Sequence, residues 1–186
     1  MGGLSAYGQL GIYPRDDCSL INISKRFELV HTMSHLKVVQ ISCGDAHTCF
    51  LTDTGRIFIC GQNEYKQISQ SGRGVYLPVE IHLADIFIGL EEQGDEVVIE
   101  VVAGGWHTMF LTNCGNVYAR GELFENPTSE SEYIRLNQGF RVARVSGGYF
   151  FSVMLDTSGD LWLFNPKSAL KRIEVSGNVI SFSCKN

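Results

Sequence analysis

Three segments of the 186-residue chain align with one another without gaps, and this internal repeat constrains the fold more than any other feature. The segments cover residues 44–61, 104–121 and 148–165. They are unequally spaced along the chain, so a unit of fixed length alternates with connections of variable length. One such unit has little apolar surface to bury by itself, and neighbouring units are therefore expected to stack on one another.

Each unit has the pattern of a β-hairpin. In the first unit an apolar strand at 48–52 leads into a polar turn, and a second apolar strand follows at 57–59. The turn ends in a glycine in every unit, at Gly55, Gly115 and Gly159. Glycine takes a positive φ at little cost, which a tight hairpin turn requires. The sequence therefore predicts three antiparallel hairpins.

The first strand of each hairpin is apolar at consecutive positions, namely 49–51, 109–111 and 153–155. A strand with one face in water would instead alternate apolar and polar residues. Apolar residues on both faces indicate a small sheet that is covered on both sides. Sheets that stack face to face around an axis, as in a β-propeller, meet this requirement.

A further apolar strand precedes each hairpin. The three copies lie at 38–42, 98–102 and 142–146, and a fourth is expected at 179–184. Near the start of the sequence, residues 7–11 echo residues 65–68, which follow the first unit. We interpret residues 1–186 as a single propeller-repeat domain. Its parts are a repeat tail at 7–11, units at about 38–68, 98–121 and 142–165, and a partial repeat strand at 179–184.

Each unit begins with a glycine, and its best copies continue with a His-Thr pair and a strand that contains leucine. A turn glycine, a strand with an aromatic residue and a closing glycine follow. The unit is then completed by a tail of the Tyr-Gly-Gln-Leu-Gly type. This order resembles the regulator of chromosome condensation repeat over residues 7–11 and 38–186. The resemblance implies an all-β fold of propeller blades, of which this chain would supply about three to four where the family usually has about seven. The structural repeat residues are Gly44, His47, Gly55, Gly61, Gly104, His107, Gly115, Gly121, Gly148 and Gly159.

Some positions depart from the repeat pattern. Lys66 replaces the tail glycine, Phe151 replaces the histidine of the third unit, and Asn165 replaces its closing glycine. Such changes are expected in blades that keep the fold but lose surface features tied to a shared partner. The incomplete ends are compatible with a fragment or short isoform of a larger propeller, with a degenerate member, or with two ends that form one shared blade. An open stack would leave unpaired strand edges, which favour self-association.

The recurring histidines, His47 and His107, are interpreted as structural. A catalytic residue is rarely needed twice, whereas an imidazole that bonds polar groups between neighbouring strands is useful in every repeat. The sequence also contains no nucleophile elbow, phosphate-binding loop, H-E-x-x-H motif or C-x-x-C pair. We therefore expect no catalytic residues, no cofactor and no metal site, and no enzyme activity of the covalent kind.

The loops that precede the hairpins contain the candidates for partner binding. The resemblance implies that exchange factors of this family use acidic and histidine side chains from such loops to bind a GTPase, and Asp45 matches that type of position. The corresponding residues, Gly105 and Tyr149, are not acidic. Trp106 and Tyr149 are candidate anchors, because aromatic side chains dominate binding hot spots. Packing between blades is the competing interpretation of both.

The charge and the apolar pattern exclude several classes of protein. A net charge of −5 disfavours nucleic-acid binding. No apolar run approaches the ~20 residues of a membrane-spanning helix. The six cysteines occur without a secretory leader, so we expect free thiols in a reducing compartment, which means the cytoplasm or the nucleus.

The leading functional hypothesis is a protein-interaction module or adaptor, because a repeat fold presents rim loops and the sequence holds no catalytic constellation. One alternative is a guanine-nucleotide exchange factor for a small Ras-like GTPase, which rests on the resemblance and on Asp45. The other is a chromatin-associated adaptor, which the acidic net charge disfavours.

Overall fold

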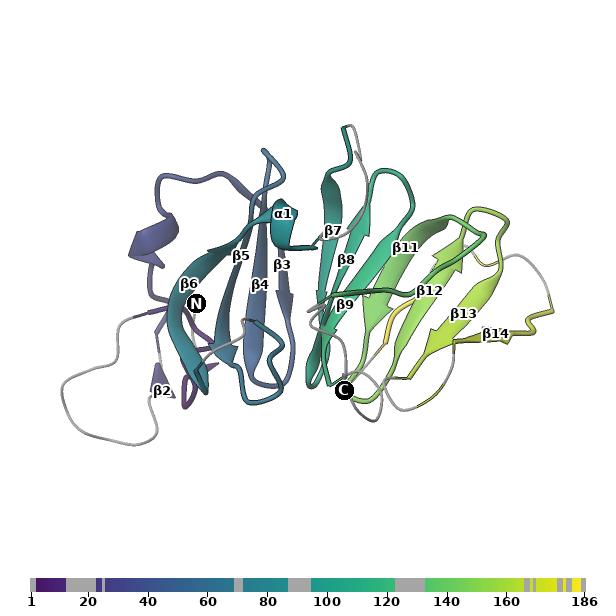
Figure 1. The fold of residues 1–186 in the computed structure, drawn as a ribbon. Coiled ribbons are helices and arrows are strands. Elements are labelled where there is room, and N and C mark those ends of the chain that lie inside the picture. The colour runs from purple at the N-terminus through teal and green to yellow at the C-terminus, as the bar shows by residue number, and fades with distance from the viewer. Residues whose placement is uncertain are drawn as a thin grey trace.

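The computed structural model describes residues 3–12, 23–24, 26–68, 72–86, 95–122, 133–165, 168, 170–176, 179 and 182–184. Three four-stranded antiparallel sheets follow one another along the chain, and Figure 1 shows them side by side with their faces turned toward each other. The first sheet consists of β3 (Val38–Cys43), β4 (His47–Thr52), β5 (Ile57–Gln62) and β6 (Gly74–Ile81). The second consists of β7 (Val98–Ala103), β8 (His107–Thr112), β9 (Val117–Gly121) and β10 (Ile134–Arg135). The third consists of β11 (Val142–Gly147), β12 (Ser152–Asp156), β13 (Leu161–Phe164) and β14 (Lys171–Ile173).

Short elements accompany the sheets. They are a two-stranded pair of β1 (Gly3–Leu4) and β2 (Ile23–Ser24), a 3-10 helix η1 (His31–Met33) and a helix α1 (Leu83–Ile86). Within the described residues no helix is long and apolar enough to span a membrane.

The sheets stack as the consecutive apolar positions predicted. Strand β7 packs on β3 and β4, and β11 packs on β7 and β8. Every residue of β4 and of β8 is buried, which requires cover on both faces. Strand β12 differs, because Ser152, Met154 and Asp156 are buried while Val153 and Leu155 are only half-buried. Among the described residues, the third sheet is thus fully covered on the face that it turns toward the second sheet, and only partly covered on its other face.

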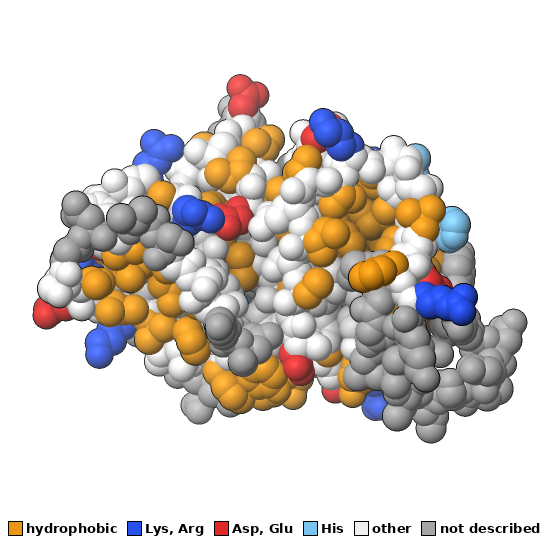
Figure 2. All heavy atoms as spheres, turned by 180° about the vertical axis from the view of Figure 1, so that it is seen from behind, with side chains coloured by type: hydrophobic (Ala, Val, Ile, Leu, Met, Phe, Trp, Pro, Cys, Tyr) orange, Lys and Arg blue, Asp and Glu red, His pale blue; other side chains and the backbone are white. Residues whose placement is uncertain are grey.

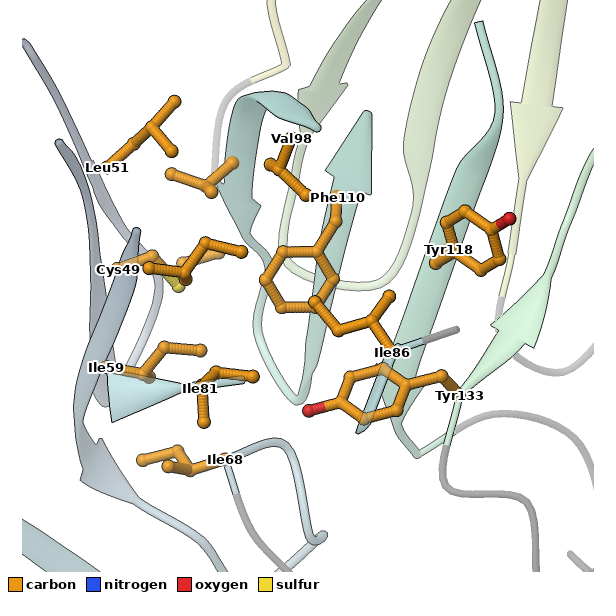
Figure 3. Packing of buried hydrophobic residues seen from close by; sticks show 13 residues of the cluster. Cys49, Leu51, Ile59, Ile68, Ile81, Ile86, Val98, Phe110, Tyr118 and Tyr133 are labelled. Carbon is orange, nitrogen blue, oxygen red and sulfur yellow. The ribbon is translucent and has the colours of Figure 1, made fainter. Parts of the chain in front are cut away.

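The largest apolar cluster fills the space between the first and second sheets. Cys49, Leu51 and Ile59 on one side face Val98 and Phe110 on the other (Figure 3). Burial of one aliphatic or aromatic side chain of this size stabilises a fold by about 1.5–3 kcal/mol. A second cluster joins the second and third sheets in the same way. A third lies on the outer face of the first sheet, where Met33 of η1 packs near Phe50 and Phe58.

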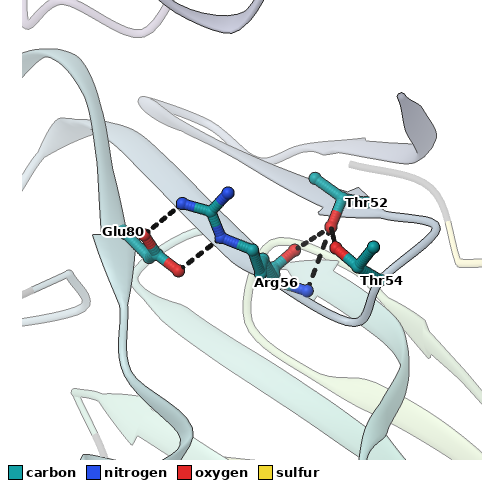
Figure 4. A network of polar contacts seen from close by, with 4 residues as sticks. All are labelled: Thr52, Thr54, Arg56 and Glu80. Atoms are coloured by element: carbon teal, nitrogen blue, oxygen red, sulfur yellow. Dashed lines mark hydrogen bonds and ion pairs between the residues drawn. The ribbon is translucent and has the colours of Figure 1, made fainter. Parts of the chain in front are cut away.

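The β4–β5 hairpin turn is closed by a threonine hydroxyl. Thr52 Oγ1 accepts the Arg56 backbone N–H at 3.0 Å, and Gly55 takes a φ of 78° (Figure 4). The Arg56 guanidinium in turn donates to both carboxylate oxygens of Glu80 on β6, at 2.7 and 2.6 Å (Figure 4). The other two hairpins repeat the turn closure with Thr112 and Asp156. The polar residue before each turn therefore fixes the hairpin that the sequence predicted.

The outermost strands and the last predicted strand add to the expected pattern. Each sheet has a fourth strand, β6, β10 or β14, that lies outside the three hairpin units. No strand is assigned at the described residues of the predicted segment 179–184, and the others lie outside the described residues. Even so, the Cys184 N–H donates to Ser146 Oγ of β11 at 2.9 Å, as the Ala103 N–H donates to Ser42 Oγ of β3 at 2.9 Å. Cys184 thus holds the place, relative to β11, that Ala103 of β7 holds relative to β3.

Candidate protein-interaction surface

The two recurring histidines link neighbouring blades. His47 Nε2 lies 3.0 Å from Thr108 Oγ1, and His107 Nε2 lies 2.7 Å from Ser152 Oγ. The Thr108 hydroxyl donates its proton to the carbonyl of Gln67 at 2.9 Å, so it accepts the N–H of His47. Each histidine therefore bonds a hydroxyl residue at the start of the second strand of the next sheet. This contact explains why the histidine recurs in the first two units, each of which is followed by another sheet.

The repeat tails take part in the same contacts between neighbouring sheets, which we call the blade seams. Gln9 accepts a hydrogen bond from the Thr48 hydroxyl through its backbone carbonyl at 2.7 Å, just as Gln67 accepts one from Thr108. A tail thus connects its own repeat to the following sheet, which is the reason that residues 7–11 and 65–68 share a pattern.

Burial holds both histidines neutral. Each side chain is about 1% exposed. Desolvation lowers the pKa of His47 to about 3, with a smaller contribution from His107, and lowers the pKa of His107 to about 4. Within the part of the chain that the structure describes, no group of three or more His, Cys, Asp or Glu side chains could hold a metal ion. The histidines therefore serve as hydrogen-bonding groups of the blade seams.

Glycines let the loops of adjacent blades approach closely. A Cβ on Gly44 would lie 2.1 Å from the Gly104 carbonyl oxygen, and one on Gly104 would lie 2.2 Å from the His107 ring. The closing residues Gly61 and Gly121 have φ values of 119° and 117°. In the third unit the Gly148 N–H donates to the Phe151 carbonyl at 2.7 Å, the bond that Gly44 and Gly104 make to their histidines. These contacts fix the loops between the first and second strands of each sheet.

The fixed loops bring four aromatic rings together at one rim of the stack. The ring of Trp106 lies 5.2 Å from Tyr65, 5.1 Å from Tyr149 and 5.2 Å from Phe150, measured between centroids. Tyr149 and Phe150 also meet each other, at 4.4 Å in an edge-to-face geometry. We call the surface formed by Asp45, Tyr65, Trp106, Tyr149 and Phe150 the aromatic rim surface.

Backbone hydrogen bonds hold Asp45 beside these rings. The Asp45 N–H donates to the Gly104 carbonyl at 3.3 Å, and the Gly105 N–H donates to the Tyr149 carbonyl at 3.1 Å. Desolvation, the Asp45 carboxylate and Tyr65 together raise the pKa of the Tyr149 hydroxyl. The acid and the aromatic rings thus belong to one continuous site that is built from all three sheets.

The aromatic rim surface is accessible to a partner. Phe150 is 56% exposed and Tyr65 is 37% exposed, while Asp45 is exposed and both Trp106 and Tyr149 are half-buried. The two candidate anchors therefore pack between blades and also present part of their rings to solvent. Figure 2 shows hydrophobic side chains gathered at the lower edge of the molecule, with acidic side chains beside them.

Sequence reasoning placed Asp45, Trp106 and Tyr149 in equivalent loops, and the structure brings all three together. It assigned Tyr65 to the repeat tail alone and missed its contact with Trp106. The available sequence signal is the tail pattern that residues 65–68 share with residues 7–11. In the structure the Gln67 carbonyl of this tail accepts the Thr108 hydroxyl of the second sheet, which brings Tyr65 close to that sheet. A residue that opens such a tail must lie near the next blade's loop.

Stacked four-stranded sheets joined by histidine seams define the chain as a set of β-propeller blades. Family models described as "Regulator of chromosome condensation (RCC1) repeat" match residues 1–51 and 38–67. The chain therefore carries repeats of the regulator of chromosome condensation type, matched over residues 1–67.

Among known relatives, the RCC1-like G exchanging factor-like protein of Mus musculus is 35% identical over 97 residues, which cover 52% of this chain and 20% of that protein. The ultraviolet-B receptor UVR8 of Arabidopsis thaliana is 28% identical over 171 residues, which cover 87% of this chain and 35% of that protein. The chain therefore spans only about a fifth to a third of these relatives.

Solved structures share the fold at low sequence identity. Human WBSCR16 superposes with a TM-score of 0.76 at 18% identity, over 99% of this chain and 50% of that one. Prp20p from Saccharomyces cerevisiae superposes with a TM-score of 0.66 at 16% identity, over 96% of this chain and 48% of that one. Both comparisons match the three sheets to about half of a larger chain.

Proposed function

We propose that this chain is a protein-interaction module that binds a partner protein through the aromatic rim surface. The observation that carries the proposal is the contact of Tyr65, Tyr149 and Phe150 with the single ring of Trp106 on an accessible rim. Aromatic side chains supply most of the energy in binding hot spots, especially where several of them lie at the centre of a patch.

The rigidity of the loops supports this proposal. The rings are set on loops that close backbone contacts hold in place, so little ordering is needed when a partner binds. The proposal assigns no catalytic role to the recurring histidines, whose Nε2 atoms bond hydroxyl groups of the neighbouring sheet.

The proposal is tested by affinity capture with two matched variants. Trp106→Ala removes the central ring of the aromatic rim surface, whereas Phe27→Ala removes a ring that is 97% exposed outside this surface. We expect the wild-type chain and Phe27→Ala to retain one partner protein at equal, stoichiometric levels. We expect Trp106→Ala to weaken its retention at least tenfold, as for a hot-spot residue. Equal retention by both variants, or no stoichiometric partner, would contradict the proposal.

A second candidate function is guanine-nucleotide exchange on a small Ras-like GTPase. The exposed Asp45 supports it, as does the 35% identity to a relative that is named an RCC1-like G exchanging factor-like protein. An exchange factor stabilises the nucleotide-free GTPase and needs no covalent chemistry. We expect nucleotide release from one member of a GTPase panel to accelerate and Asp45→Ala to slow it. No acceleration at micromolar concentration eliminates this function.

A third candidate is a chromatin-associated adaptor. Prp20p, which shares the fold, binds Gsp1p and histones, and this binding is a property of that protein. The net charge of −5 counts against contact with DNA, but an acidic chain can bind basic histones. Retention on nucleosomes at physiological salt is the result that would support this candidate.

A further inference from the structure

Acidic side chains lie at both rims of the stack. At the rim of the hairpin turns, three carboxylates are paired with cations: Glu80 with Arg56 at 2.6 Å, Asp53 with Lys37 at 3.3 Å and Asp160 with Arg172 at 2.6 Å. At the opposite rim, Asp45 forms no ion pair with any described residue. Its charge is therefore available to a ligand.

The surroundings of Asp45 add to this negative character. The faces of aromatic rings carry a partial negative charge, and four rings lie together here. Glu64, next to Tyr65 in the chain, is exposed, and among the described residues its partner is the uncharged Gln62 amide, which donates to it at 2.9 Å. Two cations lie nearby as well: Lys66 is exposed, and the buried Arg120 donates to the Lys66 carbonyl at 2.5 Å.

Ring faces beside an unpaired carboxylate suit a cation on a long apolar stem. The ammonium of lysine or the guanidinium of arginine binds over a tryptophan or tyrosine face, and the stem covers the remaining apolar area. A purely apolar side chain would leave Asp45 without a counter-charge. An acidic one would meet repulsion.

We propose that the aromatic rim surface recognises a lysine or arginine side chain of the partner protein, held between the rings around Trp106 and the Asp45 carboxylate. This inference rests on the proposed function and specifies the chemistry of the partner. It concerns a protein partner, and charge complementarity with the Asp45 carboxylate, which has no described ion pair, is the reason for choosing a basic segment.

The test uses the whole chain and five peptides with blocked ends, in which glycine alternates with one kind of residue. That residue is lysine, arginine, trimethyl-lysine, acetyl-lysine or norleucine. Trimethyl-lysine keeps the charge but cannot donate a hydrogen bond, whereas acetyl-lysine loses the charge and norleucine is apolar. Binding is followed by the indole N–H resonance of Trp106, which is identified by its loss in Trp106→Leu.

We expect the three cationic peptides to bind about tenfold more tightly than the two uncharged ones, and salt to weaken their binding. Asp45→Asn should weaken binding of the lysine peptide about threefold or more. Its matched control, Asp53→Asn, removes the same charge at the opposite rim and should leave binding unchanged. Norleucine binding as tightly as lysine would overturn the proposal, as would equal effects of the two asparagine variants.

The outcomes of the two experiments are distinguishable. If the peptides show no preference for charge while Trp106→Ala still loses the captured partner, the surface binds a protein but not through a cation, and only the present inference fails. If Trp106→Ala also retains the partner, the proposed interaction surface itself is wrong.

Discussion

At the scale of the single residue, the repeat keeps its backbone conformation at a position where the amino-acid type has changed. Gly8 in the first tail takes a φ of 87°, and Lys66 at the matching position of the second tail takes a φ of 57°. It is the one non-glycine residue with positive φ in the described part of the chain. A side chain in this left-handed region costs roughly 1–2 kcal/mol.

Lys66→Gly is therefore expected to raise the free energy of unfolding by about 0.5–1 kcal/mol, because relief of this strain exceeds the added flexibility of the unfolded chain. Urea denaturation with an unchanged m-value provides the measurement. Lys66→Ala is the control, since it removes the long side chain but keeps the Cβ and so the strain. The same stability gain in both variants would show that the side chain, and not the backbone, is responsible.

At the scale of the element, the sequence predicted the hairpins correctly and missed their outer neighbours. The β4–β5, β8–β9 and β12–β13 hairpins follow from apolar strands around a glycine turn. The outer strands β6, β10 and β14 come after connections of variable length, so no repeat period marks them. They also lie at sheet edges with one neighbour each, where an apolar pattern is weaker.

The seam between the second and third sheets offers a test of how the elements are held together. Ser152→Ala would leave the buried Nε2 of His107 without its partner at 2.7 Å. An unsatisfied buried polar group costs about 1–3 kcal/mol, and we expect the unfolding free energy to fall by that amount. Ser158→Ala, in the exposed turn of the same hairpin, is the matched control. The seam would be energetically unimportant if both variants unfolded at the same urea concentration.

At the scale of the whole molecule, the sequence predicted a stack of sheets but not how unequal its two ends are. Positions equivalent to the buried Leu51 and Leu111 hold Leu155 in the third sheet, which is only half-buried. This difference depends on what covers a sheet, and not on the residue itself. The assembly of the aromatic rim surface has the same origin, since Tyr65 and Trp106 meet only because one repeat tail packs on the next sheet.

The buried seams should make the stability of the whole stack sensitive to acid. Burial lowers the pKa of His47 to about 3 and that of His107 to about 4, against about 6.5 in an unfolded chain. Well above pH 6.5 both histidines are neutral in either state, and pH has little effect through them. Below it the unfolded chain binds protons that the folded chain does not, so the unfolded state gains stability as the pH falls toward the folded values.

We therefore expect the unfolding free energy to decrease between pH 7 and pH 5, by an amount of the order of 2 kcal/mol for each histidine. Urea denaturation at half-unit steps of pH measures this slope. His107→Gln keeps a polar side chain in the seam but cannot titrate, and it should remove about half of the slope. Phe27→Ala, which removes an exposed side chain that cannot titrate, should leave the slope as it is. An unchanged slope in His107→Gln would mean that acid acts on the fold elsewhere than at the histidines that join its blades.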